Sequence, residues 1–245
     1  MKIEKYIIEI LITIAVFIIL LYSSDPVLYS DSGRYLEQSL NDPPLYSFLI
    51  SVLILIFKNL NSVIIFQTLF IGFSIIFFSK IITDQFNLNF VVKILVAIFL
   101  FLPVIQFYNN LLTEPISYAF SLLFVSFVIK LIYRFNIFNL CFRTFFVIIL
   151  LLTRNQFIFL YPVIIILYLG IFIVHNSKKI LTVLSFSFIS IIIAHNSLIF
   201  LNTFIKQDSF NSEKLAYIQK GPYYFTYFDA IYISTGKDIE LFENK

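Results

Sequence analysis

Hydrophobic and polar positions alternate along this chain in long blocks, not at the short period of a surface helix or strand. The apolar blocks cover residues 6–22, 45–57, 62–83, 90–106, 115–133, 137–153, 157–174 and 180–201. Most approach the roughly 20 residues that an α-helix needs to cross the hydrocarbon layer of a bilayer. A polar tail, 202–245, follows them. The pattern predicts an all-α polytopic membrane protein.

The block 45–57, "LYSFLISVLILIF", is shorter than the others. Pro43 and Pro44 precede it and the polar stretch "KNLN" follows it, so it cannot easily be lengthened into a full span. Apolar segments of about 10–14 residues are typical of re-entrant or interfacial helices. We therefore expect this block not to cross.

Composition supports the membrane class. Hydrophobic residues make up 60% of the chain and charged residues only 13%, against about 25% charged residues in soluble domains. The net charge of +3 comes without a basic cluster and gives no reason to expect nucleic acid as a partner. The first block lacks a small-residue cleavage site, so we read it as a retained anchor and not as a signal peptide.

Loop charges predict the topology, because Lys and Arg accumulate on the cytoplasmic side. If the N-terminus is inside and 45–57 does not cross, the inner side holds Lys2, Lys5, Lys80, Lys93, Lys130, Arg134, Arg143, Lys178 and Lys179. The outer short connections then hold only Arg34, Lys58 and Arg154. If 45–57 does cross, the bias reverses.

The first arrangement therefore predicts about seven transmembrane helices plus one short re-entrant or interfacial helix. They form a transmembrane domain over 1–201, with an outer loop at 24–44 and an extracytoplasmic tail at 202–245.

The stretch "YSDSGRYLEQSLNDPPLYSF" is a polar island after the first block. It reads as a short amphipathic helix carrying Asp31, with Tyr35 one turn later. A carboxylate at the membrane surface can accept a proton from an incoming hydroxyl or hold a metal ion. The alternative is that Asp31 caps the helix by accepting hydrogen bonds from free backbone N–H groups.

Glu114 lies between Thr113 and Pro115 at the mouth of a predicted span, in a loop with no other charge. Carboxylates near membrane depth are costly and usually functional or paired. The alternative is a carboxylate solvated among headgroups, or one that caps the helix opened by Pro115.

Arg154, in "TRNQF", is an outer arginine between two spans. Its planar guanidinium suits a phosphate, to which it can make two charge-assisted hydrogen bonds; the alternative is snorkelling to lipid headgroups. Arg34 and Lys58 are weaker candidates for the same task. His195 lies inside the last block, where a neutral, hydrogen-bonded histidine is the usual case and a metal ligand the rarer one.

These short motifs, in this order, resemble the integral-membrane glycosyltransferases of the GT-C superfamily, which include the protein mannosyltransferases and bacterial aminoarabinose transferases. The stretch "SDSGRYLEQSLNDPPLYSFLISVL" matches their first outer loop, with Asp31 at the loop acid. "LLTEPISYAF" matches the later acid-bearing step at Glu114, and "LLTRNQFIFLYPVIII" the arginine-bearing segment at Arg154. The resemblance covers roughly residues 1–175, and the chain has fewer spans than usual for the family.

The resemblance implies a glycosyltransferase of the inner (plasma) membrane that uses a sugar joined to polyprenyl phosphate. Asp31 would deprotonate the acceptor, and Arg154 would stabilise the departing phosphate, with Tyr35, Arg34 and Lys58 as further substrate-binding candidates. Glu114 would orient the acceptor or ligate a divalent metal ion, for which His195 is a second candidate ligand. The alternative functions are a non-catalytic or truncated membrane subunit, and a transporter or flippase for lipid-linked sugars.

Overall fold

The computed structural model describes residues 3–22, 26–36, 43–160 and 162–166, with a few helical positions between 182 and 196. Its described part is helical, and the β-bridge it contains joins Val27 to Asn110. The elements are α1 (Ile3–Tyr22), α2 (Ser30–Leu36), α3 (Pro44–Phe57), α4 (Asn61–Phe86), α5 (Phe90–Phe107), α6 (Thr113–Tyr133), α7 (Ile137–Thr153) and the 3₁₀ turn η1 (Asn155–Phe159). The predicted all-α class is confirmed for these residues.

Among the described helices, α4, α5 and α6 are long and apolar enough to cross a membrane. Shorter apolar helices run over Tyr6–Leu21, Pro44–Phe57 and Ile137–Thr153. These lengths and compositions are compatible with the predicted membrane protein. The expected spans at 157–174 and 180–201 and the tail at 202–245 lie largely or wholly outside the described residues.

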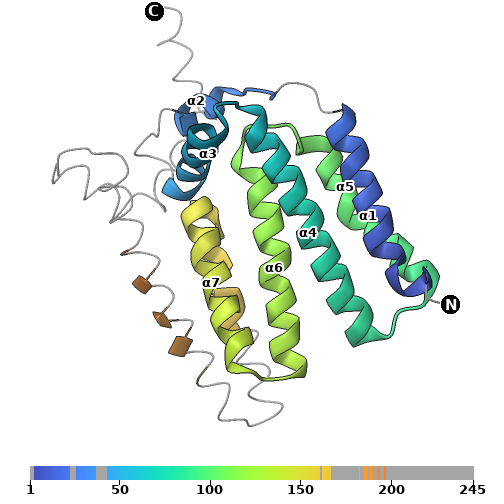
Figure 1. Cartoon of the computed structure of the whole chain (residues 1–245). Helices are drawn as coiled ribbons and strands as arrows, with labels where there is room; N and C mark the ends of the chain where they lie inside the picture. The colour runs from blue at the N-terminus through green and yellow to red at the C-terminus, as the bar shows by residue number, and fades with distance from the viewer. Residues whose placement is uncertain are drawn as a thin grey trace, which may run out of the picture.

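The helices form a bundle with α6 between α4 and α7 (Figure 1). On the far side of α4, α1 packs against both α4 and α5, while α3 contacts α2, α4 and α7. One apolar core joins α6 to α7 through residues such as Phe127 and Val147, and another joins α1 to α4 through Ile12 and Ile75. This order of neighbours fixes which helix ends can meet.

A glycine sets the spacing between α1 and α4. A Cβ built on Gly72 would lie 2.5 Å from Cγ2 of Val16. Small residues allow membrane helices to approach closely and gain van der Waals contact. Val16 is β-branched and has little rotamer freedom in a helix, so it cannot readily move aside. Gly72 is therefore required for this helix contact.

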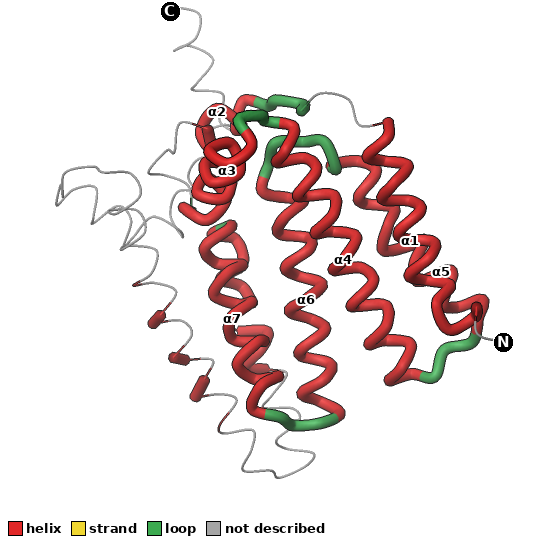
Figure 2. Tube along the Cα trace, in the orientation of Figure 1, coloured by secondary structure: helices red, strands yellow, loops and turns green. Residues whose placement is uncertain are grey.

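The main helices alternate in direction, whereas α3 does not join the alternation (Figures 1 and 2). The traces of α1, α5 and α7 end where α4 and α6 begin, and α2 and α3 both lie at that end. We call it the α2–α3 end. Because α3 leads back to the start of α4 there, the chain reaches α4 without a traverse of the bundle. That block 45–57 does not cross a membrane stays a prediction.

Charged side chains follow the same division. Asp31, Arg34, Lys58, Glu114 and Arg154 lie at the α2–α3 end, and Lys80, Asp84, Lys93, Lys130 and Arg134 lie toward the opposite end. Arg143, grouped by sequence with the inner loops, is fully buried in the first half of α7. Among these residues the cations number four at the end away from α2 and three at the α2–α3 end, so the described side chains alone do not decide the orientation.

Candidate functional site

The site begins with a loop-to-loop contact at the α2–α3 end. Val27 donates its backbone N–H to the carbonyl of Asn109 at 2.9 Å and accepts from the N–H of Leu111 at 3.1 Å. These bonds join the segment before α2 to the turn between α5 and α6. Buried or membrane-edge backbone groups need such partners. The contact brings Asp31 and Glu114, remote in sequence, to the same region.

Ser32 strengthens that contact from within α2. Its Oγ accepts the backbone N–H of Tyr29 at 2.9 Å and donates to the carbonyl of Leu111 at 2.8 Å. The side chain is buried. Since one hydroxyl closes the turn into α2 and also bonds the α5–α6 turn, the orientation of α2 is fixed relative to the start of α6.

Two buried hydrogen bonds in series join α3, α4 and the α5–α6 turn in this region. The hydroxyl of Tyr46 in α3 donates to Oε1 of Gln67 in α4 at 2.6 Å, and Nε2 of Gln67 donates to the carbonyl of Asn110 at 3.3 Å. Tyr46 and Gln67 are both fully buried. Burial, then Tyr35 and Glu114, raise the pKa of the Tyr46 phenol well above 10.0, so it remains a hydrogen-bond donor at ordinary pH.

Glu114 and Arg154 form an ion pair. Nη1 of Arg154, directly after α7, lies 2.8 Å from Oε1 of Glu114 in the first turn of α6. The side chains of Arg154 and Glu114 are 33% and 40% exposed, respectively. The structure therefore decides between the alternatives for Glu114 in favour of a paired carboxylate. The second carboxylate oxygen, Oε2, is buried and has no hydrogen-bond partner among the described residues.

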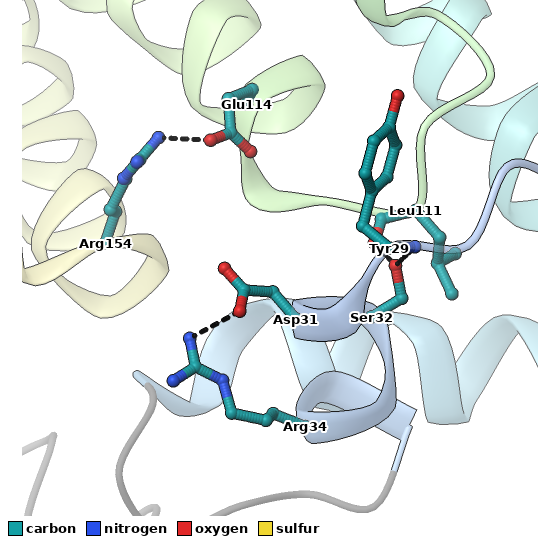
Figure 3. A network of polar contacts seen from close by, with 7 residues as sticks. All are labelled: Tyr29, Asp31, Ser32, Arg34, Leu111, Glu114 and Arg154. Carbon is teal, nitrogen blue, oxygen red and sulfur yellow. Dashed lines mark hydrogen bonds and ion pairs between the residues drawn. The ribbon is translucent and has the colours of Figure 1, made fainter. Parts of the chain in front are cut away.

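Asp31 faces this pair from α2. Figure 3 shows its carboxylate pointing toward the space between Glu114 and Arg154. It also lies 3.4 Å from Nη2 of Arg34, one turn along α2, with both side chains about half exposed. An exposed i, i+3 pair of this kind contributes a few tenths of a kcal/mol, which is too little to immobilise Asp31.

The four charged groups sum to zero and alternate in sign around the same region. A site with no net charge can bind an anion through a guanidinium if the anion displaces the paired carboxylate, or if the guanidinium bonds the anion and the carboxylate together. It can also accept a proton on a carboxylate that lies beside the anion. The arrangement therefore supplies both a phosphate-binding group and a base within one end of the bundle.

The other predicted residues are placed differently. Tyr35 is buried and packs edge-on against Tyr46, with ring centroids 5.2 Å apart. Lys58 ends α3 in a left-handed conformation and is exposed, and no contact between described residues joins it to Glu114 or Arg154. His195 lies outside the described residues.

Metal ligation was a second expectation for Glu114. Within the described ranges, no group of three or more His, Cys, Asp or Glu side chains lies close enough together to hold a metal ion. Glu114 itself holds Arg154 through Oε1. Of the carboxylates that the structure describes, Asp31 and Glu114 lie in this region.

Sequence reasoning missed the neutral members of the site: Ser32, Tyr46, Gln67 and Asn110. The pattern did contain one signal. Gln67 is an amide within an apolar block, where an unpaired polar group is costly and so implies a partner. Its partners, a phenol and a backbone carbonyl, cannot be identified from spacing because they come from two other elements.

Comparison with known proteins adds no relative. No protein-family model matches the chain, and no curated protein or solved structure matches it.

Proposed function

We propose that this membrane protein is a glycosyltransferase that moves a sugar from a polyprenyl-phosphate donor to an acceptor at the outer face of the membrane. The observation that carries the proposal is the meeting of Asp31, Glu114 and Arg154 at one end of the bundle. Electrostatic stabilisation of the charge that develops in the transition state usually accelerates a reaction more than any other single effect. Arg154 is paired with Glu114 and faced by Asp31, where it can stabilise the departing phosphate.

The proposed step is a displacement at the anomeric carbon. Asp31 takes the proton of the acceptor hydroxyl or amine as the acceptor atom bonds to that carbon. The bond from the carbon to the phosphate oxygen breaks, and polyprenyl phosphate leaves as an anion held by Arg154. Glu114 orients Arg154 through the observed ion pair.

In the proposed topology the N-terminus is cytoplasmic and seven helices cross, while α3 does not. The α2–α3 end then faces outward, where a lipid-linked sugar in the outer leaflet reaches it. The distribution of Lys and Arg among the loops of the sequence supports this orientation.

Transfer at one face is favoured over translocation by how interior hydroxyls are bonded. Thr68, Ser74 and Ser126 each donate to the carbonyl four residues earlier in their own helix. They do not form a polar path across the described bundle, as a translocation route would require. Several hydrogen bonds that join separate described elements lie instead at the α2–α3 end, such as those of Ser32, Tyr46 and Gln67.

The test is transfer by the purified protein in liposomes, with a panel of radiolabelled polyprenyl-phosphate sugars and a membrane extract as acceptor source. We expect Asp31→Asn to abolish transfer while membrane insertion stays at the wild-type level. Asp84→Asn, an exposed carboxylate away from the α2–α3 end, is the matched control and should leave transfer unchanged. Full transfer by Asp31→Asn would remove Asp31 from the reaction.

A further inference from the structure

The buried hydrogen bonds Tyr46–Gln67–Asn110 join α3 and α4, which carry none of the four charged groups of the site, to the turn before α6. Glu114, one of the two carboxylates of the site, follows that turn. Tyr46 belongs to α3 and Gln67 to α4, whereas Asn110 belongs to the turn that leads into α6 and Glu114. The ring of Tyr46 also packs against Tyr35, one turn beyond Asp31 in α2. The two carboxylate-bearing segments thus share one support.

Gln67 is the centre of this support because it uses both ends of its amide. Its oxygen accepts from Tyr46, and its nitrogen donates to a backbone carbonyl. Gln67 is fully buried, so loss of either partner would leave one end of its amide without a hydrogen bond, which is costly in a buried site. A leucine of similar size at position 67 would keep the packing but leave the Tyr46 hydroxyl and the Asn110 carbonyl without these hydrogen bonds.

We infer that Gln67, with Tyr46, is a positioning residue that holds the Glu114-bearing turn against the Asp31-bearing helix. The inference rests on the proposed function only for its effect on sugar transfer. Both side chains are fully buried, so neither is accessible to a bound substrate. Arg154 directly follows α7 and is bonded to neither Tyr46 nor Gln67, so its own backbone anchor does not depend on the support and we expect donor binding to change less than the transfer rate.

The first experiment needs no activity and measures opening of the α5–α6 turn. Asn110→Cys in a Cys141→Ser background places a thiol at a position that is 9% exposed; the contact to Gln67 uses the backbone carbonyl and is kept. We expect Gln67→Leu to speed labelling of this thiol by about tenfold or more, as loss of a buried hydrogen bond implies, and Tyr46→Phe by less.

Thr68→Val is the matched control. Thr68 is the next residue, is equally buried, and donates to Ile64 in its own helix. Its substitution should leave labelling at the wild-type rate. If Gln67→Leu labels no faster than Thr68→Val, the positioning role is wrong, whatever the protein catalyses.

The second experiment separates positioning from general stability. Gln67→Leu should lower kcat for sugar transfer at least about tenfold while KM for the lipid donor changes less than about twofold, and Thr68→Val should change neither. Equal changes in both constants, or a kcat loss shared by Thr68→Val, would overturn the inference. If wild-type protein transfers no sugar, the proposed function fails and the labelling result still decides the positioning role.

Discussion

Arg154 and Glu114 are 40 residues apart in the chain, yet their side chains meet at 2.8 Å through one guanidinium nitrogen and one carboxylate oxygen. The contact joins the end of α7 to the start of α6. The single observed bond leaves further guanidinium N–H groups for an incoming phosphate. The pair is therefore suited to orient Arg154 before a ligand arrives.

Removal of the guanidinium should weaken donor binding. We expect Arg154→Ala to raise the Kd for polyprenyl phosphate by about 10- to 100-fold, as loss of charge-assisted hydrogen bonds worth roughly 1.5–3 kcal/mol implies. Arg154→Lys keeps the charge but loses the planar guanidinium that can bond two phosphate oxygens, so its Kd should lie between those of the wild type and Arg154→Ala. The Kd is measured for polyprenyl phosphate binding to protein in nanodiscs. If both Arg154→Ala and Arg154→Lys leave this Kd nearly unchanged, Arg154 contacts lipid headgroups instead.

Neutralising Glu114 should have the opposite effect on binding. Glu114→Gln keeps a side-chain oxygen that can accept from Arg154 but removes the negative charge that competes with phosphate, so the affinity for polyprenyl phosphate should rise severalfold while sugar transfer slows. The same nanodisc assay measures the Kd. Weaker binding in this variant would mean that the charge of Glu114 holds Arg154 in its binding orientation. Asp84→Asn, remote from the pair, serves as the control.

Gly72 offers a test of the α1–α4 contact. Gly72→Ala should lower the melting temperature, because a methyl group 2.5 Å from Val16 overpacks the interface at a cost of about 1–3 kcal/mol. Val16→Ala should rescue much of the loss in the double variant. Gly33→Ala is the matched control: a Cβ there meets nothing within 4 Å, and alanine favours a helix by up to about 1 kcal/mol. A stable Gly72→Ala would show that the two helices can separate freely.

Single cysteines test the direction of α3. In a Cys141→Ser background, Leu28→Cys before α3 and Asn59→Cys after it should react with an impermeant thiol reagent from the same side. Asn136→Cys, between α6 and α7, should react from the other side. Asn59 and Asn136 are both exposed and both accept a backbone N–H at a helix start, so their substitutions are comparable. Opposite labelling of Leu28→Cys and Asn59→Cys would mean that α3 crosses the membrane.

Block lengths and turn residues predicted the described helices closely. The blocks at 90–106 and 137–153 became α5 and α7 with at most one residue added, because an apolar run must bury its backbone in helical hydrogen bonds. The short block became α3 beside α2. The pairing of Glu114 with Arg154 was implied only as a shared side, since contact between two helices depends on their rotation and packing.

The uncharged residues Tyr46 and Gln67 could not be predicted in the same way. By position alone Tyr46 is an interfacial tyrosine, and spacing does not single out Gln67. In the structure they bond each other at 2.6 Å, because the position of α3 beside the start of α4 brings a phenol to a buried amide. That contact depends on tertiary geometry, which periodicity does not encode. The sequence therefore identified the charged groups better than the groups that hold them.

The bond pattern of Val27 has a consequence for biosynthesis. Its backbone partners, Asn109 and Leu111, lie about 80 residues downstream, so α2 emerges from the ribosome long before its docking surface exists. Glu114 in turn waits for Arg154 before its charge is neutralised. Synthesis must therefore tolerate an incomplete α2–α3 end until α7 has been made, and a pause after α6 would leave a half-assembled chain open to quality-control proteases.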